Sequence, residues 1–570
     1  MRYLALAVDY DGTAAVDDRL TDSAAVAIER LRVSGRRAVL VTGRRLAELL
    51  RVCPRVDLFD LIVAENGAVL YDPQQRDEIP LASPLPASFA ERLRQRGVSP
   101  LETGSVIVAT QEPHGPVMLD VIRELGLELQ VVFNRSAIMA LPPGVNKGSG
   151  LQVALRKLGL SPHEAVAIGD AENDHSLLDC CECGVAVANA VPSLQQRAAF
   201  VTRGANGAGV AELIDELIAN DLHRMEGRLE QHLLLIGKRG DGTAVRIPPY
   251  GRNVLIAGPS GSGKSTLTAG LIERLIDKAY QVCILDPEGD YGTLQGVVCL
   301  GNPQRAPSVG EVLSSLEDPA TNLAVNLLGL PLQDRPPFFS QLIAGLQALR
   351  ARTGRPHWIV LDEAHHMLPQ SWGHVSSVLP SQLGEAILVT VHPDHVAPAV
   401  LAPIDLVLAV GKEPERTMKK FAGAVAQPLT WPPSLSYEQG KVVAWLVRDE
   451  QQPPFTVEPQ PCRAERIRHH RKYAEGNLRY HSFYFRGPEG RLNLRAQNLW
   501  MFCQIAEGLD EQTWMFHLRR RDYSRWFRKA IRDEYLAQQT ERIELRADLT
   551  WLQSRHLIRE LVGARYTLPE

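Results

Sequence analysis

The chain has 570 residues, several times the size of a usual single domain, so about three domains are expected. About 45% of the residues are hydrophobic and 22% are charged, which is typical of a folded globular protein and excludes wholesale disorder. The formal net charge of -4 excludes a broadly basic protein, so any contact with DNA has to come from a local patch. There is no run of 18 apolar residues, and the eight cysteines form no paired zinc motif, so we expect a cytoplasmic protein with no membrane partner.

Residues 1–220 alternate short β-branched runs with helical segments, the pattern of a doubly wound parallel sheet in an α/β domain. Strands are predicted at residues 3–8, 38–41, 61–64, 165–169 and 184–188. Helices are predicted at residues 22–34, 45–51 and 147–158. A segment at about 72–140, rich in proline and polar residues, interrupts the pattern with strands of its own at 104–110 and 128–133. We interpret this segment as an insertion into the domain.

Two carboxylates follow the first predicted strand, in the sequence Asp9-Tyr10-Asp11-Gly12-Thr13. The carboxyl end of a parallel strand is where ligands bind in α/β sheets. Asp9 can attack phosphorus, and Asp11 can protonate the leaving oxygen and then activate water. An acidic turn at a strand end is the alternative explanation for this motif when it is taken alone.

Three further elements follow in order along the chain. Thr42 and Gly43 follow the strand 38–41, where a hydroxyl and backbone N–H groups can hold a phosphoryl oxygen. Lys147 opens a helix and can neutralise transition-state charge, and Asp170 and Asp174 follow the strand 165–169 as oxygen ligands for Mg²⁺. Each has a simpler alternative, namely a helix N-cap, a solvated helix residue and a capped loop. Their combination, each at a predicted strand end or helix start, indicates a phosphatase site.

With these motifs, residues 1–215 resemble the haloacid dehalogenase (HAD) superfamily, in its Cof-like and sucrose-phosphate-phosphatase-like branch. The similarity is carried by DYDGT, VTGR, AENGA, VNKGSGL, GDAENDHSLL, VANA and GAGVAELI. The resemblance implies a Rossmann-like core with a cap at about 72–140, and a sugar phosphate or similar small metabolite as substrate. It makes Asp9 the nucleophile that forms an aspartyl-phosphate and Asp11 the general acid/base. The binding residues that it implies are Thr42, Gly43, Lys147 and Asn173 for the phosphoryl group, and Asp9, the Asp11 carbonyl, Asp170 and Asp174 for Mg²⁺.

Residues 228–448 show a second α/β pattern, again typical of a doubly wound parallel sheet. Its strands are predicted at residues 253–257, 281–285, 357–361, 386–391 and 405–410. The strand 253–257 runs into GPSGSGKST and then a helix, the context that a P-loop requires, so ATP is the expected cofactor. Lys264 would reach the β- and γ-phosphates, and Ser265 would contribute a hydroxyl ligand to Mg²⁺. The predicted ATP-binding residues are Gly258, Ser260, Gly261, Ser262, Gly263, Lys264, Ser265, Thr266 and Asp362.

A second acidic pair, Asp362-Glu363, follows the strand 357–361. Asp362 can hold Mg²⁺ through water, and Glu363 can polarise an attacking water. This catalytic role of Glu363 favours ATP hydrolysis over phosphoryl transfer by a kinase. Asp286 and Glu288 are expected near the same sheet edge, and Thr390 and His392 at the position of a γ-phosphate sensor.

On these motifs, together with LLIGKRGDG, ILDPEGDY and IVLDEAHH, residues 232–420 resemble HerA/FtsK-like P-loop ATPases. The resemblance implies a homo-oligomer through this domain and makes DNA an alternative partner, because these ATPases are typically hexameric DNA pumps. The module departs from the family in its compactness and in having Thr-Val-His where the sensor strand usually has Gln. Arg416 is either an arginine finger or part of an ion-paired helix surface, and we favour the surface.

Residues 449–475 are rich in Pro, Gln, Arg and His and are predicted to be a linker, and residues 476–570 a helical domain of unknown role. Within them, 463–472 is basic, and 517–532 interleaves arginines with Tyr523, Trp526 and Phe527. That pattern fits either nucleic-acid contact or an amphipathic helix with aromatic core residues, and we favour the helix.

The function expected from the whole sequence is a Mg²⁺-dependent phosphomonoester hydrolase with an attached ATP-binding and ATP-hydrolysing module. The alternative is a HerA-like, ATP-driven DNA translocase whose accessory phosphatase domain acts on nucleic-acid ends or nucleotides.

Overall fold

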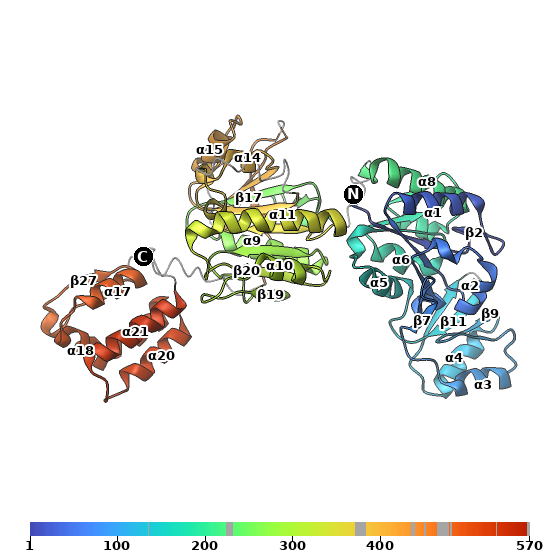
Figure 1. Ribbon diagram of the computed structural model, residues 1–570, viewed down its shortest axis with the longest axis horizontal. Helices are drawn as coiled ribbons and strands as arrows, with labels where there is room; N and C mark the ends of the chain where they lie inside the picture. Colours follow the sequence, from blue (N-terminus) through green and yellow to red (C-terminus); the bar gives the residue numbers. More distant parts are fainter. Residues whose placement is uncertain are drawn as a thin grey trace. The chain divides into compact units, whose positions relative to one another are not determined.

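The structure is a computed structural model of the 570-residue chain (Figure 1). It describes residues 1–134, 136–223, 232–370, 384–433, 440–449, 452–463, 481–531 and 533–566, together with residues 435, 438 and 478. The chain divides into two compact units. The first unit contains residues 1–233 with 317–320 and 347–356, and the second contains the remaining residues. Among the residues described, no helix has the length and apolar character needed to cross a membrane.

The first unit is built on an eight-stranded sheet in the order β14-β13-β12-β1-β4-β5-β6-β7. The strands from β14 to β5 run parallel, and β6 and β7 are antiparallel additions at one edge. This confirms the predicted α/β class. In sheet order, the strands are β14 (Phe200–Val201), β13 (Cys183–Ala186), β12 (Ala165–Gly169), β1 (Ala5–Asp9), β4 (Arg37–Val41), β5 (Leu61–Ala64), β6 (Val69–Asp72) and β7 (Asp77–Pro80).

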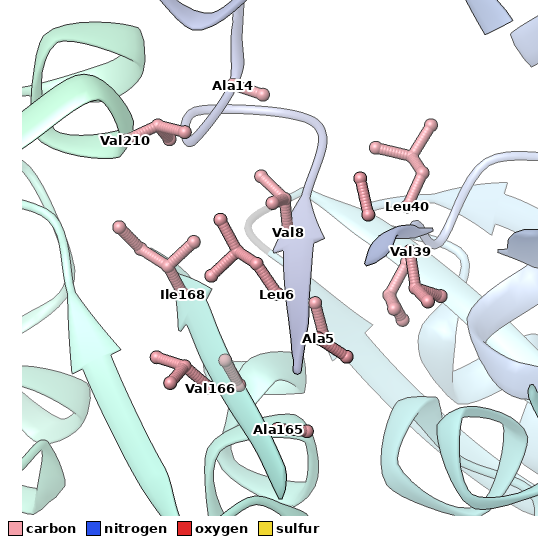
Figure 2. Close-up of a cluster of buried hydrophobic side chains, with 14 of the residues drawn as sticks. Ala5, Leu6, Val8, Ala14, Val39, Leu40, Ala165, Val166, Ile168 and Val210 are labelled. Atoms are coloured by element: carbon pink, nitrogen blue, oxygen red, sulfur yellow. The ribbon is translucent and has the colours of Figure 1, made fainter. Parts of the chain in front are cut away.

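The central strands of this sheet are buried on both faces, which is why their sequences are continuously apolar instead of alternating. Figure 2 shows Leu6 and Val8 of β1 beside Val166 and Ile168 of β12, within the cluster of buried side chains. The helices of this α/β layer are α1 (Asp22–Val33), α2 (Leu46–Val52), α5 (Lys147–Lys157), α6 (His175–Cys180), α7 (Pro192–Arg197) and α8 (Asn206–Asn220).

A separate four-stranded antiparallel sheet, in the order β10-β11-β9-β8, lies within the predicted insertion. Its elements are α3 (Ala87–Gln95), β8 (Glu102–Thr103), β9 (Val108–Gln111), α4 (Gly115–Glu124), β10 (Gln130–Asn134) and β11 (Ala137–Leu141). It has a core of its own that includes Phe89, Met118 and Ile138. The insertion was expected to begin at about residue 72, but it begins later. β7 follows that point in the chain and still pairs with β6 in the larger sheet.

The second unit contains an eleven-stranded sheet in the order β16-β15-β25-β24-β23-β17-β22-β21-β18-β20-β19. The strands from β23 to β19 are parallel, and those from β24 to β16 are antiparallel. In chain order, the strands are β15 (Leu234–Lys238), β16 (Ala244–Ile247), β17 (Asn253–Ala257), β18 (Val282–Asp286), β19 (Val297–Leu300), β20 (Asn322–Asn326), β21 (Trp358–Leu361), β22 (Ala386–Thr390), β23 (Leu406–Ala409), β24 (Val442–Leu446) and β25 (Phe455–Pro459).

The helices between these strands are α9 (Lys264–Asp277), α10 (Val309–Leu316), α11 (Arg335–Thr353), α12 (Ala364–Met367), α14 (Pro398–Leu401) and α15 (Pro414–Ala424). The predicted linker, 449–475, needs a correction: β25 lies inside it and pairs with both β24 and β15, so this part of the segment belongs to the sheet. Residues 224–231, and residues 464–475 of the predicted linker, lie outside the described residues.

The C-terminal part is mostly helical, as predicted, and begins with a hairpin of β26 (Phe483–Phe485) and β27 (Leu494–Ala496). Its helices are α17 (Leu499–Glu507), α18 (Glu511–Arg519), α19 (Asp522–Trp526), the π-helical turn η11 (Phe527–Ile531), α20 (Glu534–Glu544) and α21 (Trp551–Arg565). Side-chain N-caps fix four of the helix starts. Tyr523, Trp526 and Phe527 are buried in an aromatic core, which confirms the amphipathic alternative for these rings. The basic residues at 464–472 lie outside the described part of the chain.

Candidate active site

Three polar loops meet at one edge of the first sheet. β1 ends at Asp9, β12 is followed by Asp170, and β4 is followed by Thr42. Because β1 lies between β12 and β4 and runs parallel to both, the carboxyl ends of the three strands are adjacent. The sheet order therefore brings together loops that lie far apart in the sequence, such as those that begin at Asp9 and at Asp170.

Lys147 lies at the centre of this site. Its Nζ is 2.6 Å from Asp9 Oδ1 and 2.6 Å from Asp174 Oδ1, and all three side chains are buried. The lysine is the first residue of α5, whose start is fixed by a capping box in which Asn146 accepts from the Ser149 backbone N–H. A Cβ on Gly67 would lie 1.9 Å from the Asn146 carbonyl oxygen, so the loop before β6 packs directly onto this helix start.

The site contains a cluster of carboxylates. One oxygen each from Asp9, Asp170 and Asp174 lies within 4.8 Å of the others. Thr13 donates its hydroxyl hydrogen to Asp170 Oδ1 at 3.0 Å, and the second oxygen of Asp174 accepts from the backbone N–H groups of Asp170 and Ala171. Burial, and then the charge of Asp174, raises the pKa of Asp9 well above its usual range, while Lys147 acts in the opposite direction.

This donor set fits Mg²⁺. Lys147 contacts two of the three clustered carboxylates, Asp9 and Asp174, so an additional positive charge would be stabilised in this buried acidic group. Oxygen-only donors are also those that a hard cation prefers.

The predicted phosphoryl-binding residues lie at the same edge. A Cβ placed on Gly43 would lie 3.5 Å from Asn173 Nδ2, so the loops after β4 and β12 are in contact. Asn173 donates from Nδ2 to Asn66 Oδ1 at 3.1 Å. The Thr42 hydroxyl is buried and accepts from the Arg44 backbone N–H. These positions surround the Asp9 loop with polar groups from two neighbouring strand ends.

The second unit contains a P-loop between β17 and α9. Lys264 and Ser265 are buried at the start of the helix, and Lys264 Nζ donates to the Pro259 carbonyl oxygen at 3.3 Å. Gly263 has a φ of 107°, and a Cβ on Gly258 would lie 2.0 Å from the Val410 carbonyl oxygen, so both positions require glycine. Burial lowers the pKa of Lys264, while the acidic residues nearby act to raise it.

Asp362 and Glu363 follow β21, two strands away from the P-loop strand, and both are buried. The Glu363 backbone is left-handed (φ 43°), and its N–H donates to Asp362 Oδ1 at 2.9 Å. Burial, and then the charge of Glu363, raises the pKa of Asp362 well above its usual range. A buried acidic pair at this edge is suited to holding a metal ion and orienting water.

The end of β22 reaches this pair through a histidine that sequence reasoning missed. His365 Nδ1 lies 3.4 Å from Glu363 Oε2 and 3.0 Å from Thr390 Oγ1, and Thr390 Oγ1 accepts from the His392 backbone N–H. The predicted sensor position is therefore linked to Glu363 through one imidazole. His365 is part of the motif IVLDEAHH, but no spacing rule predicts that its ring contacts Thr390.

Two other predicted positions have structural roles here. Asp286 accepts from the backbone N–H groups of Asp290 and Tyr291 at 3.0 and 2.9 Å, so it holds its own loop. Arg416 is exposed on α15 and pairs with Glu413 at 3.1 Å, which agrees with the ion-paired helix surface that we favoured.

Comparison with known proteins identifies two families in the chain. A family model described as haloacid dehalogenase-like hydrolase matches residues 6–96 and 123–214, and one described as the helicase HerA central domain matches residues 243–336. The phosphoglycolate phosphatase of Methanothermobacter thermautotrophicus is 31% identical over 220 residues, which are 37% of this chain and 96% of that protein. The chain belongs to the haloacid dehalogenase-like hydrolase family.

A second relative agrees with this assignment. The phosphoglycolate phosphatase of Haloarcula marismortui is 32% identical over 219 residues, which are 37% of this chain and 95% of that protein. A solved sucrose-phosphatase from Synechocystis is 21% identical, with a TM-score of 0.29, and the match covers 38% of this chain and 98% of that one. The resemblances to a HAD hydrolase and to a HerA-like domain are thus both confirmed.

In this HAD hydrolase, the Asp11 carboxylate does not join the buried cluster. Its side chain is 40% exposed and pairs with Arg44, whose Nε and Nη2 lie 2.8 and 2.7 Å from the two carboxylate oxygens. Arg44 also pairs with Glu48 at 2.6 Å. The motif VTGR contains Arg44, but its partner Asp11 is 33 residues away, so no local pattern indicates this ion pair.

Glu65, in the motif AENGA, is another residue that sequence reasoning missed. Its buried carboxylate accepts from the backbone N–H groups of Ser105, Val106 and Ile107 at 2.8, 2.9 and 3.2 Å. Glu65 also has a left-handed backbone (φ 53°), which is unfavourable for a non-glycine residue unless its surroundings compensate. Glu65 therefore anchors the loop before β9 of the inserted sheet to the core of the HAD hydrolase.

Proposed function

We propose that residues 1–220 form a Mg²⁺-dependent phosphomonoester hydrolase that acts through an aspartyl-phosphate on Asp9. The observation that supports this most directly is the buried group of Asp9, Lys147 and Asp174, in which one ammonium group contacts both carboxylates at 2.6 Å. A carboxylate at a strand end, next to a fixed cation and two further oxygen ligands, is suited to attack on a phosphate ester.

In the proposed reaction, an Asp9 carboxylate oxygen bonds to phosphorus while the bond from phosphorus to the ester oxygen breaks. Lys147 stabilises the negative charge on the phosphoryl oxygens, and the Thr42 hydroxyl and the Gly43 N–H orient them. Asp11, once released from Arg44, gives a proton to the leaving alkoxide and then takes one from the water that attacks the aspartyl-phosphate. When bound, Mg²⁺ supplies positive charge that offsets the carboxylates and the phosphoryl group.

The substrate class that we propose is a small phosphorylated metabolite. The two relatives described above are named phosphoglycolate phosphatase, and they match over nearly their whole length. A phosphorylated two-carbon acid is therefore the first compound to assay, and sugar phosphates are the second class. The inserted sheet, anchored by Glu65 and by the Arg45–Glu102 ion pair (3.0 Å), is the part that would select among them.

The test of this proposal is phosphate release from phosphoglycolate and from a panel of sugar phosphates, with Mg²⁺ and with EDTA. Asp9→Asn should lower the rate by roughly 10⁴-fold or more, because the amide cannot act as the nucleophile. Asp17→Asn is a matched control, since it makes the same chemical change at an exposed position. Phosphate release by Asp9→Asn at the control's rate, or full activity in EDTA, would contradict the mechanism.

We propose further that residues 228–448 bind and hydrolyse ATP. The support is the P-loop with buried Lys264 and Ser265, and the buried pair Asp362 and Glu363 at the same sheet edge. Lys264→Ala should abolish ATP hydrolysis and leave phosphate release from the small substrate intact, if the two sites work independently. Loss of both activities in a folded Lys264→Ala protein would instead show that the ATP site controls the phosphatase.

A second candidate function is an ATP-driven DNA translocase with an accessory phosphatase, because residues 243–336 match the helicase HerA central domain. It predicts that double-stranded DNA stimulates ATP hydrolysis, and that the stimulation falls steeply with salt. It also predicts an oligomer, which light scattering would detect. ATP hydrolysis by a monomer, at a rate that is unchanged by DNA, would exclude this candidate.

A further inference from the structure

The C-terminal part of the chain (red in Figure 1), which neither family model covers, contains a pocket of about 550 Å³. One side is formed by the β26–β27 hairpin and its turn η10 (Pro488–Gly490), and the other by α18, α19 and η11. Pockets that bind small molecules have volumes of roughly 300–1,000 Å³. This pocket is therefore large enough for a ligand of the size of a nucleotide.

The lining of the pocket is cationic. Four basic side chains line it, namely Arg486, Arg520, Arg525 and Lys529, and they face two carboxylates, Glu489 and Asp522. Four positive and two negative side chains leave an excess of two positive charges in a protein whose net charge is -4. Neither Arg486 nor Lys529 makes an ion pair with any residue that the structure describes. These two cations are thus available to an anionic ligand.

The acidic groups offset this charge only in part. Asp522 is shared by three donors: His517 Nδ1 at 2.9 Å, Arg525 Nη1 at 3.3 Å and Arg520 Nε at 3.6 Å. His517 Nε2 accepts from the Arg486 backbone N–H at 3.0 Å, so this ring is neutral and carries its hydrogen on Nδ1. The hydrogen bonds through His517 also fix the hairpin to the helices, so the two walls of the pocket are held together before any ligand arrives.

Two arginines lie over aromatic rings at the pocket. The Arg520 guanidinium is 5.0 Å from the centre of the Phe516 ring, and the Arg486 guanidinium is 5.6 Å from the centre of the Tyr484 ring. Both rings are half-buried, in contrast to the fully packed aromatic core beneath them. One guanidinium group can donate two parallel hydrogen bonds to the oxygens of a phosphate. Aromatic rings and guanidinium planes also stack on nucleobases.

We propose that this pocket binds a nucleotide, with the phosphate on the arginines and Lys529 and the base stacked beside Phe516 or Tyr484. The ligand is either a free nucleotide or one unit of a single-stranded nucleic acid, since both offer a phosphate next to a planar ring. A sugar phosphate would leave the flat surfaces unused, and an acidic peptide offers no base to stack. This binding site is separate from both proposed catalytic sites, and the proposal does not depend on either activity.

The experiment measures fluorescence anisotropy with the full chain in EDTA, so that metal-dependent hydrolysis does not consume the probes. One probe is fluorescently labelled AMP, which lacks the β- and γ-phosphates that a P-loop holds, and the other is a labelled ten-residue oligothymidylate. The double variant Arg520→Glu/Lys529→Glu should weaken binding at least tenfold. A control with the same charge change, Arg542→Glu/Arg546→Glu, replaces exposed arginines outside the pocket and should stay within twofold of the unaltered protein.

A second variant, Tyr484→Leu/Phe516→Leu, keeps both positions apolar but removes both rings. It should weaken binding several-fold, and it tests the proposal even if the charge-reversed protein does not fold. Binding of both probes assigns the site to the nucleotide itself, and salt-sensitive binding of the oligothymidylate alone assigns it to a strand. The proposal is overturned if the unaltered protein binds neither probe or if the pocket variants bind like the control. Displacement of both probes by oligoglutamate as effectively as by AMP would also overturn it, because the pocket would then recognise charge alone.

Discussion

Replacing Lys147 by methionine tests the electrostatics of the first site. The side chain of Lys147 is almost completely buried, and its Nζ is 2.6 Å from a carboxylate oxygen of both Asp9 and Asp174. Methionine keeps the site filled but leaves two buried carboxylates without their cation. Removing one partner of a buried ion pair typically costs about 3–5 kcal/mol, because the remaining charge is uncompensated. For a domain of this size, that loss corresponds to a decrease in Tm of roughly 6–20 °C.

The assay has to report on the first 220 residues separately. All eight tryptophans lie beyond residue 350, so their fluorescence follows other parts of the chain and serves as an internal control. Hydrogen exchange measured by mass spectrometry on peptides from residues 1–215, over a temperature series in EDTA, follows the domain itself. We expect Lys147→Met to lower the transition seen in these peptides and to leave the tryptophan transition unchanged.

Asp9→Asn supplies the matched comparison. It removes a negative charge from the cluster in which Lys147→Met removes a positive one, and its expected effect on Tm is the opposite. Loss of one of three clustered carboxylates relieves repulsion, so its Tm in EDTA should equal or exceed that of the unaltered protein, although phosphatase activity is lost. Adding Mg²⁺ should restore part of the stability of Lys147→Met, since the cation supplies charge to the same carboxylates. Equal melting of Lys147→Met and the unaltered protein in EDTA would refute this reasoning.

Three further predictions concern other parts of the molecule. Glu65→Ala removes the acceptor of three backbone N–H groups, so amide exchange at residues 105–107 should accelerate and KM for the phosphatase substrate should rise. Glu363→Gln should lower ATP hydrolysis by about 10²-fold or more while ATP binding, measured by calorimetry, persists. Burial raises the pKa of Glu544 to about 7, above its ordinary value of 4.5, so the folded state binds this proton more tightly than the unfolded state does. The free energy of unfolding of the C-terminal part should therefore fall as pH rises from 4.5 to 7, by about 1–2 kcal/mol after allowance for partial solvent exposure. Glu544→Gln should remove this loss, which tryptophan fluorescence during unfolding would measure.

Each of these predictions has an outcome that contradicts it. Unchanged exchange at residues 105–107 in Glu65→Ala would mean that other contacts hold the loop. Rapid ATP hydrolysis by Glu363→Gln would assign the activation of water to another group, with His365 the first to examine because it lies 3.4 Å from the Glu363 carboxylate. A pH dependence that survives Glu544→Gln would place the titrating group elsewhere.

The central strands could be predicted because they are continuous apolar runs that end in polar motifs. The strand expected at 253–257 has the same bounds as β17, and the strand expected at 386–391 differs from β22 by one residue. The antiparallel additions were not predicted. β25 lies in a stretch whose composition is that of a linker, and its pairing with β15 joins residues more than 200 positions apart. Such long-range pairing leaves no local pattern in the sequence.

The same distinction holds for the sites. Residues at strand ends, such as Asp9 and Asp170, could be placed together because parallel strands share one carboxyl edge. Residues whose roles depend on a distant partner could not, which explains why the Arg44–Asp11 and Glu65–Val106 contacts were missed. The pocket of the C-terminal part was also missed, because its cations come from a hairpin and from helices whose relative position the amphipathic pattern does not specify.

The close packing of Gly67 on Asn146 has an evolutionary consequence. After Gly67 the chain adds β6 and β7 to the core sheet, passes through the inserted sheet and returns to the core at Asn146, which touches Gly67. The inserted part between β7 and Asn146 can be lengthened, shortened or exchanged without displacing Lys147, because Asn146 is held against Gly67 of the core. A lineage can therefore acquire a new substrate by replacing this stretch of chain, while the groups that break the ester bond are inherited unchanged.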